Sequence, residues 1–191
     1  PLEGGVSSDI WRIDTADGPV CAKRALPRLR VAADWRAPIA RNLYEARWMQ
    51  VAGEAVPGCT PRLLGQHERL GVLVMEYLPP QDHRLWKAML RDGEVDLGHA
   101  CEVATTIARI HAHSAARPAL AAEFATDAIF FDIRLEPYLL ATAARHPDLA
   151  DELSGLVAQT RAHRVALVHG DVSPKNILIG PRGPVLLDAE C

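Results

Sequence analysis

The stretches His169-Gly-Asp-Val-Ser-Pro-Lys-Asn176 and Leu186-Leu-Asp188 decide the fold that we expect for this chain of 191 residues. Their polar residues suit phosphoryl transfer, which needs an oriented acceptor hydroxyl and a metal ion that neutralises phosphate charge. Asp171 can orient the hydroxyl or accept its proton. Asn176 offers an amide oxygen and Asp188 a carboxylate, and both are hard oxygen ligands that suit Mg²⁺. The sequence therefore predicts Asp171 as the catalytic residue and Asn176 and Asp188 as metal ligands.

The spacing of these residues carries further information. Between Asn176 and Asp188, two short apolar runs flank the turn Gly180-Pro-Arg-Gly-Pro184. This pattern predicts a hairpin that returns Asp188 to the vicinity of Asn176. A purely structural interpretation stays open, in which Asp171 caps a turn and the other two residues end a loop and a strand. The joint pattern His-x-Asp-x-x-x-x-Asn is that of a kinase catalytic loop and favours function, with His169 holding the loop by packing and hydrogen bonds.

The motif resembles the HGDxxxxN loop, followed by a later Asp, of the aminoglycoside phosphotransferase and choline kinase family. Ile107-Ala-Arg-Ile-His111 is similar to the helix that precedes this loop in the family. The resemblance implies an α+β, two-lobe protein-kinase-like fold, ATP and Mg²⁺ as cofactors, and a small-molecule hydroxyl acceptor. It implies that Asp171 is the catalytic base or the hydroxyl-orienting residue, and that Asn176 and Asp188 hold magnesium. Glu190 would act in the outer shell of the metal.

Eukaryotic protein kinases resemble this chain less. Their loop has Arg where Gly170 stands, and many of them have Lys where Ser173 stands. Lys175 is interpreted as a solvated cation of the loop.

If the late motif is a kinase loop, the early part of the chain must bind the nucleotide. Lys23 lies on a predicted strand after a hairpin, where its ammonium can reach the α- and β-phosphates. The two-residue period of a strand puts Cys21, Lys23 and Ala25 on one face, so that Cys21 would cover the adenine. An acid on the following helix should orient Lys23. Glu45 is the best candidate, and Glu54, near the helix end, is a weaker one.

The segment Gly4-Gly-Val-Ser-Ser8 precedes the first predicted strand and is a candidate for covering the phosphates. Ser7 and Ser8 would donate hydroxyl or main-chain N–H bonds to phosphate. The segment lacks a full GxGxxG pattern, and a frayed terminus is the alternative.

The segment Val74-Met-Glu-Tyr-Leu78 resembles the hinge of a kinase. Main-chain groups of Glu76 and Leu78 would hydrogen-bond to the adenine. The structural alternative is an edge strand that leads into a linker at Pro79-Pro80.

Hydrophobic periodicity predicts the order of the elements. Strands and one helix come first, helices follow the double proline, and short strands end the chain. We therefore expect an N-terminal nucleotide-binding lobe over residues 1–78 and a partial C-terminal lobe over residues 79–191. Because the chain begins at Pro1 and stops straight after an apolar run, we expect a fold truncated at its C-terminus. The expected strands are 9–14, 20–25, 70–78, 166–168, 177–179 and 185–187, and the expected helices are 38–52, 85–90, 100–115 and 136–144.

The composition narrows the classes of partner. The chain is 49% hydrophobic and 24% charged, with a formal net charge of −3 and an isoelectric point near 6.3. No overall basic field favours nucleic acid or an anionic membrane as a partner, and no apolar run approaches the roughly 20 residues of a membrane span. The four cysteines lie far apart without a CxxC pair, which favours a reduced, cytoplasmic protein over a zinc or disulfide framework.

Two other functions compete with the kinase interpretation. In a metal-dependent phosphoesterase, His169 and His111-Ala-His113 would join the acids as ligands, but the last two histidines point to different sides of a helix. A nucleotide-binding fragment without catalysis is the second alternative. The identity of the acceptor and the oligomeric state do not follow from the sequence. The acidic residues between Asp82 and Asp96 either attract a cationic acceptor or are solvated.

Overall fold

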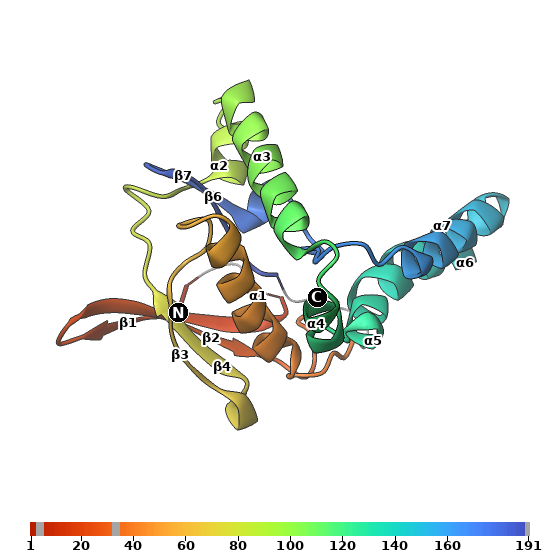
Figure 1. Cartoon of the computed structure of the whole chain (residues 1–191), viewed down its shortest axis with the longest axis horizontal. Helices are drawn as coiled ribbons and strands as arrows, with labels where there is room; N and C mark the ends of the chain where they lie inside the picture. Colours follow the sequence, from red (N-terminus) through yellow and green to blue (C-terminus); the bar gives the residue numbers. More distant parts are fainter. Residues whose placement is uncertain (3–5, 32–34, 190–191) are drawn as a thin grey trace.

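The computed structural model describes residues 1–2, 6–31 and 35–189 (Figure 1). Its N-terminal half is built on an antiparallel sheet of order β1-β2-β4-β3. The strands are β1 (Ser8–Thr15), β2 (Gly18–Ala25), β3 (Leu63–His67) and β4 (Val72–Glu76). The tight β1–β2 turn places Gly18 at φ +111°, a conformation that glycine adopts without steric cost.

Helix α1 (Arg41–Ala55) packs on this sheet. Ala46 and Met49 of the helix form a buried cluster with Leu73 and Met75 of β4. The helix ends before Pro57, which cannot donate the next hydrogen bond of a helix. Its other faces are also buried, because the C-terminal half of the chain packs against them.

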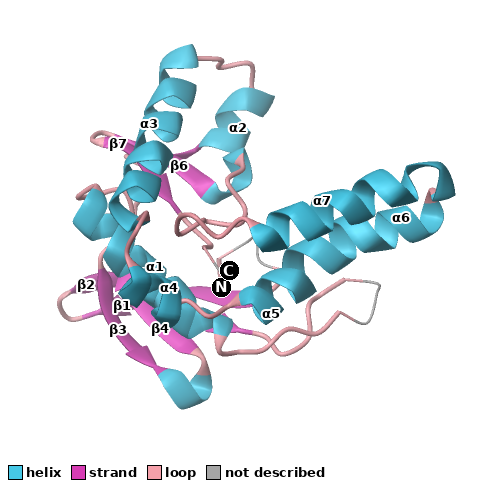
Figure 2. Ribbon diagram, turned by 45° about the vertical axis from the view of Figure 1, so that its right-hand side comes forward, coloured by secondary structure: helices cyan, strands magenta, loops and turns pink. Residues whose placement is uncertain are grey.

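The C-terminal half contains a second antiparallel sheet of order β5-β6-β7. Its strands are β5 (Arg84–Leu85), β6 (Ile177–Gly180) and β7 (Gly183–Leu186). Helices α2 (Trp86–Arg91) and α3 (Leu97–Ser114) lie beside it, as Figure 2 shows. The first sheet uses residues up to 76 and the second uses residues from 84 on, with Pro79-Pro80 between them. The lobe boundary at 78/79 stays a prediction.

A helical arm extends from the body of the molecule (Figures 1 and 2). A π-helix (Phe131–Leu140) that contains Pro137 leads directly into α6 (Ala141–Arg145), and both pack against α7 (Ala150–Ala162). Proline lacks an N–H donor, and an irregular helical turn of this kind accommodates the missing bond. The shorter elements are α4 (Pro118–Glu123), α5 (Asp127–Phe130) and the 3₁₀ turns Glu68–Leu70, Pro147–Leu149 and Pro174–Asn176.

The main hydrophobic core joins the two halves of the chain. Trp48 of α1 lies in one buried cluster with residues of α3, β6 and β7. The cluster consists of Trp48, Ala52, Cys59, Val103, Ile110, Ile177, Leu186 and Ala189. A main-chain bond from Leu186 N to Cys59 O, 2.8 Å long, reinforces the contact. Within the described ranges, no helix combines the length and the apolar character needed to cross a membrane.

The prediction of a strand at residues 166–168 is wrong. This segment is irregular, because side chains rather than a neighbouring strand satisfy its main-chain groups. Leu167 N donates to the hydroxyl of Ser114, and Val168 O accepts from the indole of Trp48. Leu167 packs against the main core, although the segment does not extend a sheet.

Candidate active site

Lys23 lies on β2 between two paired strands, opposite Ile10 of β1 and Leu73 of β4. Only 3% of its side chain is exposed, and its ammonium contacts two carboxylates. The oxygens of Glu45 lie 2.7 and 2.8 Å from Nζ, and Oδ1 of Asp188 lies 2.5 Å away. The ion pair that the sequence predicted between Lys23 and Glu45 is therefore present. Glu54, the weaker candidate, lies instead at the far end of α1, within 4.0 Å of Arg47.

Asp188 connects the two halves electrostatically through its contact with Lys23. Burial raises the pKa of its carboxyl, but the nearby ammonium of Lys23 outweighs this effect, so the pKa lies below its ordinary value. The carboxylate form is thus favoured near neutral pH. The backbone of Asp188 has φ +67°, in the left-handed region that side chains other than glycine rarely adopt. Such strain is typical of functional positions.

The β6–β7 hairpin brings Asp188 and Asn176 together, as the spacing predicted. Ile177 pairs with Leu186 in the antiparallel register. One residue further out, Leu187 N donates to Asn176 O at 2.9 Å. The side-chain amide of Asn176 in turn donates from Nδ2 to the main-chain oxygen of Asp171, 3.1 Å away. Asn176 therefore links the loop that carries Asp171 to the strand end that carries Asp188.

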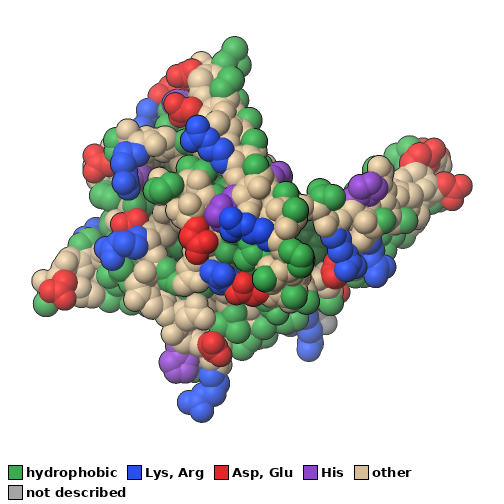
Figure 3. Space-filling view, in the orientation of Figure 1, with side chains coloured by type: hydrophobic (Ala, Val, Ile, Leu, Met, Phe, Trp, Pro, Cys, Tyr) green, Lys and Arg blue, Asp and Glu red, His purple; other side chains and the backbone are tan. Residues whose placement is uncertain are grey.

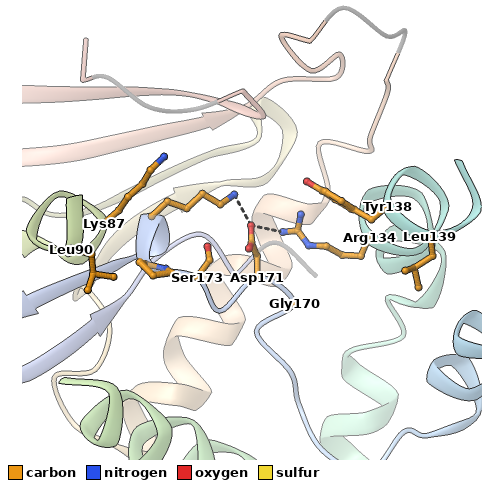
Figure 4. A pocket seen from close by; sticks show the side chains of 10 residues that line it. Lys87, Leu90, Arg134, Tyr138, Leu139, Gly170, Asp171 and Ser173 are labelled. Carbon is orange, nitrogen blue, oxygen red and sulfur yellow. Dashed lines mark ion pairs between the residues drawn. The ribbon is translucent and has the colours of Figure 1, made fainter. Parts of the chain in front are cut away.

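Asp171 lies between two cations, as Figure 4 shows. Nζ of Lys175 is 2.7 Å from Oδ2 of Asp171, and Nη2 of Arg134 is 3.7 Å from the same oxygen. Burial raises the pKa of Asp171, but the Lys175 contact and the Arg134 charge lower it by more, so the net pKa is below its ordinary value. Lys175, interpreted from sequence as a solvated cation, is half-exposed but pairs with Asp171.

His169 supports the loop from beneath, in the role that the sequence predicted. Its side chain is only 2% exposed, and its Nδ1 accepts a hydrogen bond from Asp171 N. Its ring packs edge-on against Trp48 of α1, with centroids 4.9 Å apart. Burial lowers the pKa of His169 to about 4, so the ring is neutral at physiological pH. A neutral ring can accept at Nδ1, whereas a fully protonated one cannot.

The comparisons with known proteins agree with this geometry. The chain matches the model of the phosphotransferase enzyme family, APH, over residues 1–191. It belongs to this family. Among curated protein sequences, none matches the chain.

The solved structure of a choline/ethanolamine kinase family protein from Mesorhizobium loti has a similar fold to this family member. The TM-score is 0.56 at 20% sequence identity, with 100% of this chain and 58% of that chain covered. This chain therefore spans 58% of the length of the solved relative. The similarity confirms the α+β, two-lobe protein-kinase-like fold that the sequence predicted.

The donor set of this phosphotransferase-family site fits Mg²⁺. Because Nδ2 of Asn176 donates to Asp171 O, its amide oxygen is the atom available to a metal. Asp188 uses Oδ1 toward Lys23 and has a second carboxylate oxygen. An amide oxygen and a carboxylate held on adjacent chain segments are hard ligands of the kind Mg²⁺ prefers. Glu190 lies outside the described residues.

The remaining nucleotide candidates lie on the N-terminal sheet or just after it. Cys21 is half-buried against the α1 cluster, two residues from Lys23 on β2. The amide N–H of Glu76 donates to Arg62 O at 2.9 Å, so this group already has a partner. Leu78 follows β4 in the connection toward Pro79. The contacts of Cys21, Glu76 and Leu78 with adenine stay predictions.

Ser8 begins the first strand and Ser7 precedes it, and Gly4 and Gly5 of the same segment lie outside the described residues. The main-chain oxygen of Ser7 accepts from Leu26 N and from the guanidinium of Arg41. Arg41, the first residue of α1, thereby ties the start of β1 to the helix. The phosphate contacts proposed for both serines stay predictions.

Two arginines of the site region belong to no sequence motif, so the sequence analysis did not identify them. Arg134 lies on the π-helix, 37 positions before Asp171 along the chain, and only the folded arm brings it to the loop. Arg41 lies at a helix start, where a basic residue is not usual, because the N-terminal end of a helix carries partial positive charge. A tertiary contact decides the place of each, and a local pattern does not encode such a contact.

Proposed function

We propose that the protein is an ATP-dependent phosphotransferase that moves the γ-phosphate to a hydroxyl group of a small molecule. One observation carries the proposal: the Lys23 ammonium lies buried between Glu45 and Asp188, and Asn176 connects Asp188 to the Asp171 loop. This arrangement joins a phosphate-binding cation, a pair of metal ligands and a hydroxyl-orienting carboxylate. Family membership supports the same class of reaction.

Each residue would act through its own chemistry. Lys23, oriented by Glu45, would bind the α- and β-phosphates, and Asn176 and Asp188 would hold Mg²⁺. A bound Mg²⁺ would neutralise the phosphate charge. Because Lys175 and Arg134 keep Asp171 ionised, Asp171 is available to accept a hydrogen bond from the acceptor hydroxyl and to take its proton. Cys21, Glu76 and Leu78 would contact the adenine, and Ser7 and Ser8 would cover the phosphates.

We also propose that the protein is cytoplasmic and that its partner is a small molecule. Cys21, Cys59 and Cys101 are free thiols, as expected in the reducing cytoplasm. On the face shown in Figure 3, basic and acidic side chains are interspersed over the described residues, which fits a small-molecule partner better than a polyanion. The relative from Mesorhizobium loti is named for choline and ethanolamine, both of which are hydroxyl compounds.

The phosphoesterase alternative finds less support in the geometry. His113 lies on α3, where its ring is 3.7 Å from Glu54 and 3.0 Å from Arg117. His169 uses Nδ1 to accept from Asp171 N, which leaves that nitrogen unable to bind a metal. A hydrolytic site would also leave the Lys23–Glu45 pair without a role.

Two isosteric substitutions test the proposal in the full-length protein. Asp171→Asn keeps the size of the side chain but removes its charge, and should lower kcat roughly 100-fold or more while ATP binding is retained. Asp188→Asn removes a charged metal ligand, and should abolish turnover and raise the Mg²⁺ requirement. The measurements are kcat, the Kd of ATP and the Mg²⁺ dependence of each variant.

Glu54→Gln provides the matched control, because Glu54 lies on α1 but does not contact Lys23. We expect its kinetics to stay close to those of the unmodified protein. Near-normal ATP-dependent turnover in Asp171→Asn would remove Asp171 from catalysis. Turnover that needs the metal but not ATP would instead favour the phosphoesterase.

A further inference from the structure

Lys175 is a charged residue of the catalytic loop that the sequence predicted to be only solvated. It belongs to the short 3₁₀ turn Pro174–Asn176 and immediately precedes Asn176, the proposed metal ligand. Two hydrogen bonds close the loop at this point. Asn176 N donates to Ser173 O at 2.9 Å, and Nδ2 of Asn176 donates to Asp171 O at 3.1 Å. The backbone at position 175 is therefore held between the proposed hydroxyl-orienting carboxylate and the metal ligand.

The side chain of Lys175 lies against Asp171, in the lining of a cavity. Its Nζ is 2.7 Å from Oδ2 of Asp171, and both residues line a cavity of about 700 Å³ (Figure 4). Residues of α2 and of the π-helix also line this cavity, Leu90 and Tyr138 among them. The charge of Lys175 acts on Asp188 as well. One ammonium therefore acts on both carboxylates that frame the proposed transfer.

Arg134 is the second cation at Asp171, but it has less freedom to move. Its Nη2 lies 3.7 Å from Oδ2 of Asp171, its Nη1 donates to Ile133 O at 3.4 Å, and its Nε is buried. Its charge also acts on Asp188. Only 16% of the Arg134 side chain is exposed, against 51% of the Lys175 side chain. Arg134 thus acts on the carboxylates from a fixed place on the π-helix, whereas Lys175 can change its partner.

The ion pair between Lys175 and Asp171 can be exchanged at little cost. Water screens an ion pair whose cation is half-exposed, and such pairs are weak. Within the described residues, Asp171 is the carboxylate with which Lys175 forms its ion pair. A lysine stem is flexible, and its ammonium binds phosphate oxygens as a compact point charge. The ammonium can therefore turn from Asp171 to a phosphoryl group that arrives beside it.

The geometry of phosphoryl transfer brings such a group to this place. The acceptor hydroxyl must lie roughly 3 Å from an oxygen of Asp171, and the γ-phosphorus roughly 3 to 3.5 Å from the hydroxyl oxygen. Nζ of Lys175, at 2.7 Å from the same carboxylate, is within reach of the phosphoryl oxygens. When the hydroxyl proton passes to Asp171, the carboxyl becomes neutral and Lys175 loses its counter-charge. The phosphoryl oxygens then carry the charge that the ammonium can meet.

We propose that Lys175 is a further catalytic residue, whose ammonium leaves Asp171 and donates hydrogen bonds to the oxygens of the phosphoryl group during transfer. The bond between the γ-phosphorus and the β,γ-bridging oxygen breaks, this oxygen keeps the electron pair, and a bond from phosphorus to the acceptor oxygen forms. The hydroxyl proton passes to Asp171, Lys175 keeps its protons, and the products are ADP and a phosphate monoester. This inference rests on the proposed function. It adds a phosphate-binding lysine on the acceptor side to Lys23 on the nucleotide side.

A transition-state analogue tests this role without an identified acceptor. Aluminium fluoride takes the place of the transferred phosphoryl group beside ADP, with water in the place of the hydroxyl, and such analogues bind more tightly than substrates. Calorimetry on the full-length protein measures the Kd of Mg-ADP with and without aluminium fluoride. We expect the fluoride to lower this Kd. Lys175→Ala should reduce the effect about tenfold, the factor for one charge-assisted contact, and should leave the Kd of Mg-ADP alone nearly unchanged.

Further variants separate charge from packing. Lys175→Gln keeps most of the length without the charge and should behave like Lys175→Ala, whereas Lys175→Arg keeps the charge and should restore part of the effect. Urea unfolding of each variant shows that its fold is retained. Arg91→Ala is the matched control, because Arg91 is an exposed cation that pairs with Asp92 at 2.9 Å and lies outside the cavity lining. The fluoride effect should not change in this control.

The outcomes separate this inference from the proposed function. An equal fluoride effect in Lys175→Ala and in the unmodified protein overturns the inference and leaves the kinase proposal standing. An equally large loss of affinity for Mg-ADP alone overturns it as well, because Lys175 would then act on the nucleotide. The inference also fails if Mg-ADP binds to the unmodified protein and aluminium fluoride does not tighten this binding. If neither Mg-ADP nor Mg-ATP binds, the proposed function itself fails.

Discussion

Arg41 shows how a single buried cation can hold a site region in place. Its side chain is fully buried, and its guanidinium donates to four main-chain oxygens: those of Ser7, Leu26, Ala37 and Pro38. These oxygens belong to the start of β1, the end of β2 and the approach to α1. The planar guanidinium, with its five N–H donors, suits several carbonyls at fixed angles.

Replacement of Arg41 should therefore destabilise the fold. Arg41→Ala removes four buried hydrogen bonds to main-chain oxygens, and we expect the free energy of unfolding to fall by roughly 3 kcal/mol or more. Arg41→Lys should recover part of the loss, because an ammonium keeps the charge but not the forked geometry. Urea unfolding measures the difference. Arg145→Ala, at an exposed position, should change it by less than about 0.5 kcal/mol.

His169 predicts a pH dependence of stability. Its pKa is lowered from 6.5 to about 4 in the folded protein, so the unfolded chain binds the proton more readily between these values. The free energy of unfolding should therefore have its full value above about pH 6.5. It should fall by roughly 3 kcal/mol in all as the pH drops toward 4. Unfolding free energies of the protein and of His169→Gln, measured from pH 7.5 to 4.5, test this. A difference between the two proteins that does not vary with pH would contradict it.

The residues predicted from sequence are those that belong to a local pattern. Asp171, Asn176 and Asp188 share one loop and one hairpin, so their spacing was sufficient to bring them together. To predict the contact between Lys23 and Glu45, it was enough to assume that a strand and the next helix are adjacent. Arg134 could not be predicted, because its contact with Asp171 depends on how an irregular helical arm folds back onto the loop.

At the scale of elements, alternation and a turn signal predicted β1 and β2, helical spacing of apolar residues predicted α1, and two apolar runs around a Gly/Pro turn predicted the β6–β7 hairpin. The sequence did not predict strand β3 (Leu63–His67). Gly65 and the polar residues after it weaken the pattern of a strand, and the register of its pairing with β4 shifts between Leu63 and Gly65. The expected helix 136–144 covers parts of two elements, since Pro137 lies inside a π-helix that continues into α6.

Strand β2 offers a direct probe of the nucleotide proposal. Cys21 is half-buried and two residues from Lys23, and burial raises the pKa of its thiol. We expect a maleimide to label Cys21 slowly, and Mg-ATP to slow this labelling several-fold by covering the thiol. Mass spectrometry of the labelled peptides measures the rate at each cysteine. A rate at Cys21 that does not respond to nucleotide would remove it from the adenine site.

Two other thiols serve as internal controls in the same experiment. Burial raises the pKa of Cys59 to about 11, and its side chain lies in the main core, so it should stay unlabelled until the protein unfolds. Cys101 is exposed on α3 and should react first, at a rate that nucleotide does not change.

At the scale of the whole molecule, helix α1 connects the two halves, because it contributes Ala46 and Met49 to the cluster under the first sheet and Trp48 and Ala52 to the main core. Trp48 of α1 packs with Ile110 of α3 and Leu186 of β7, and the Lys23–Asp188 pair joins residues from both halves. The order of the elements predicted the two lobes and the joint at Pro79-Pro80. It did not predict this shared core, because periodicity shows which face of a helix is apolar but not which element covers it.

The shared core predicts one cooperative unfolding transition. Tryptophan fluorescence and far-ultraviolet circular dichroism should give coincident urea curves, the test of two-state behaviour. Trp48→Ala should move both curves together and lower the free energy of unfolding by about 4 kcal/mol. Two separated transitions would show instead that the lobes fold independently.

At position 188, the backbone conformation and the proposed chemistry favour different residues. The φ of +67° at Asp188 costs on the order of 1 kcal/mol that glycine would not incur. A library randomised at this position and selected only for soluble, folded protein should therefore become enriched in glycine or asparagine. Selection for phosphate transfer should return aspartate. The residue that best fits the chain at position 188 and the residue that best serves its proposed chemistry are thus different.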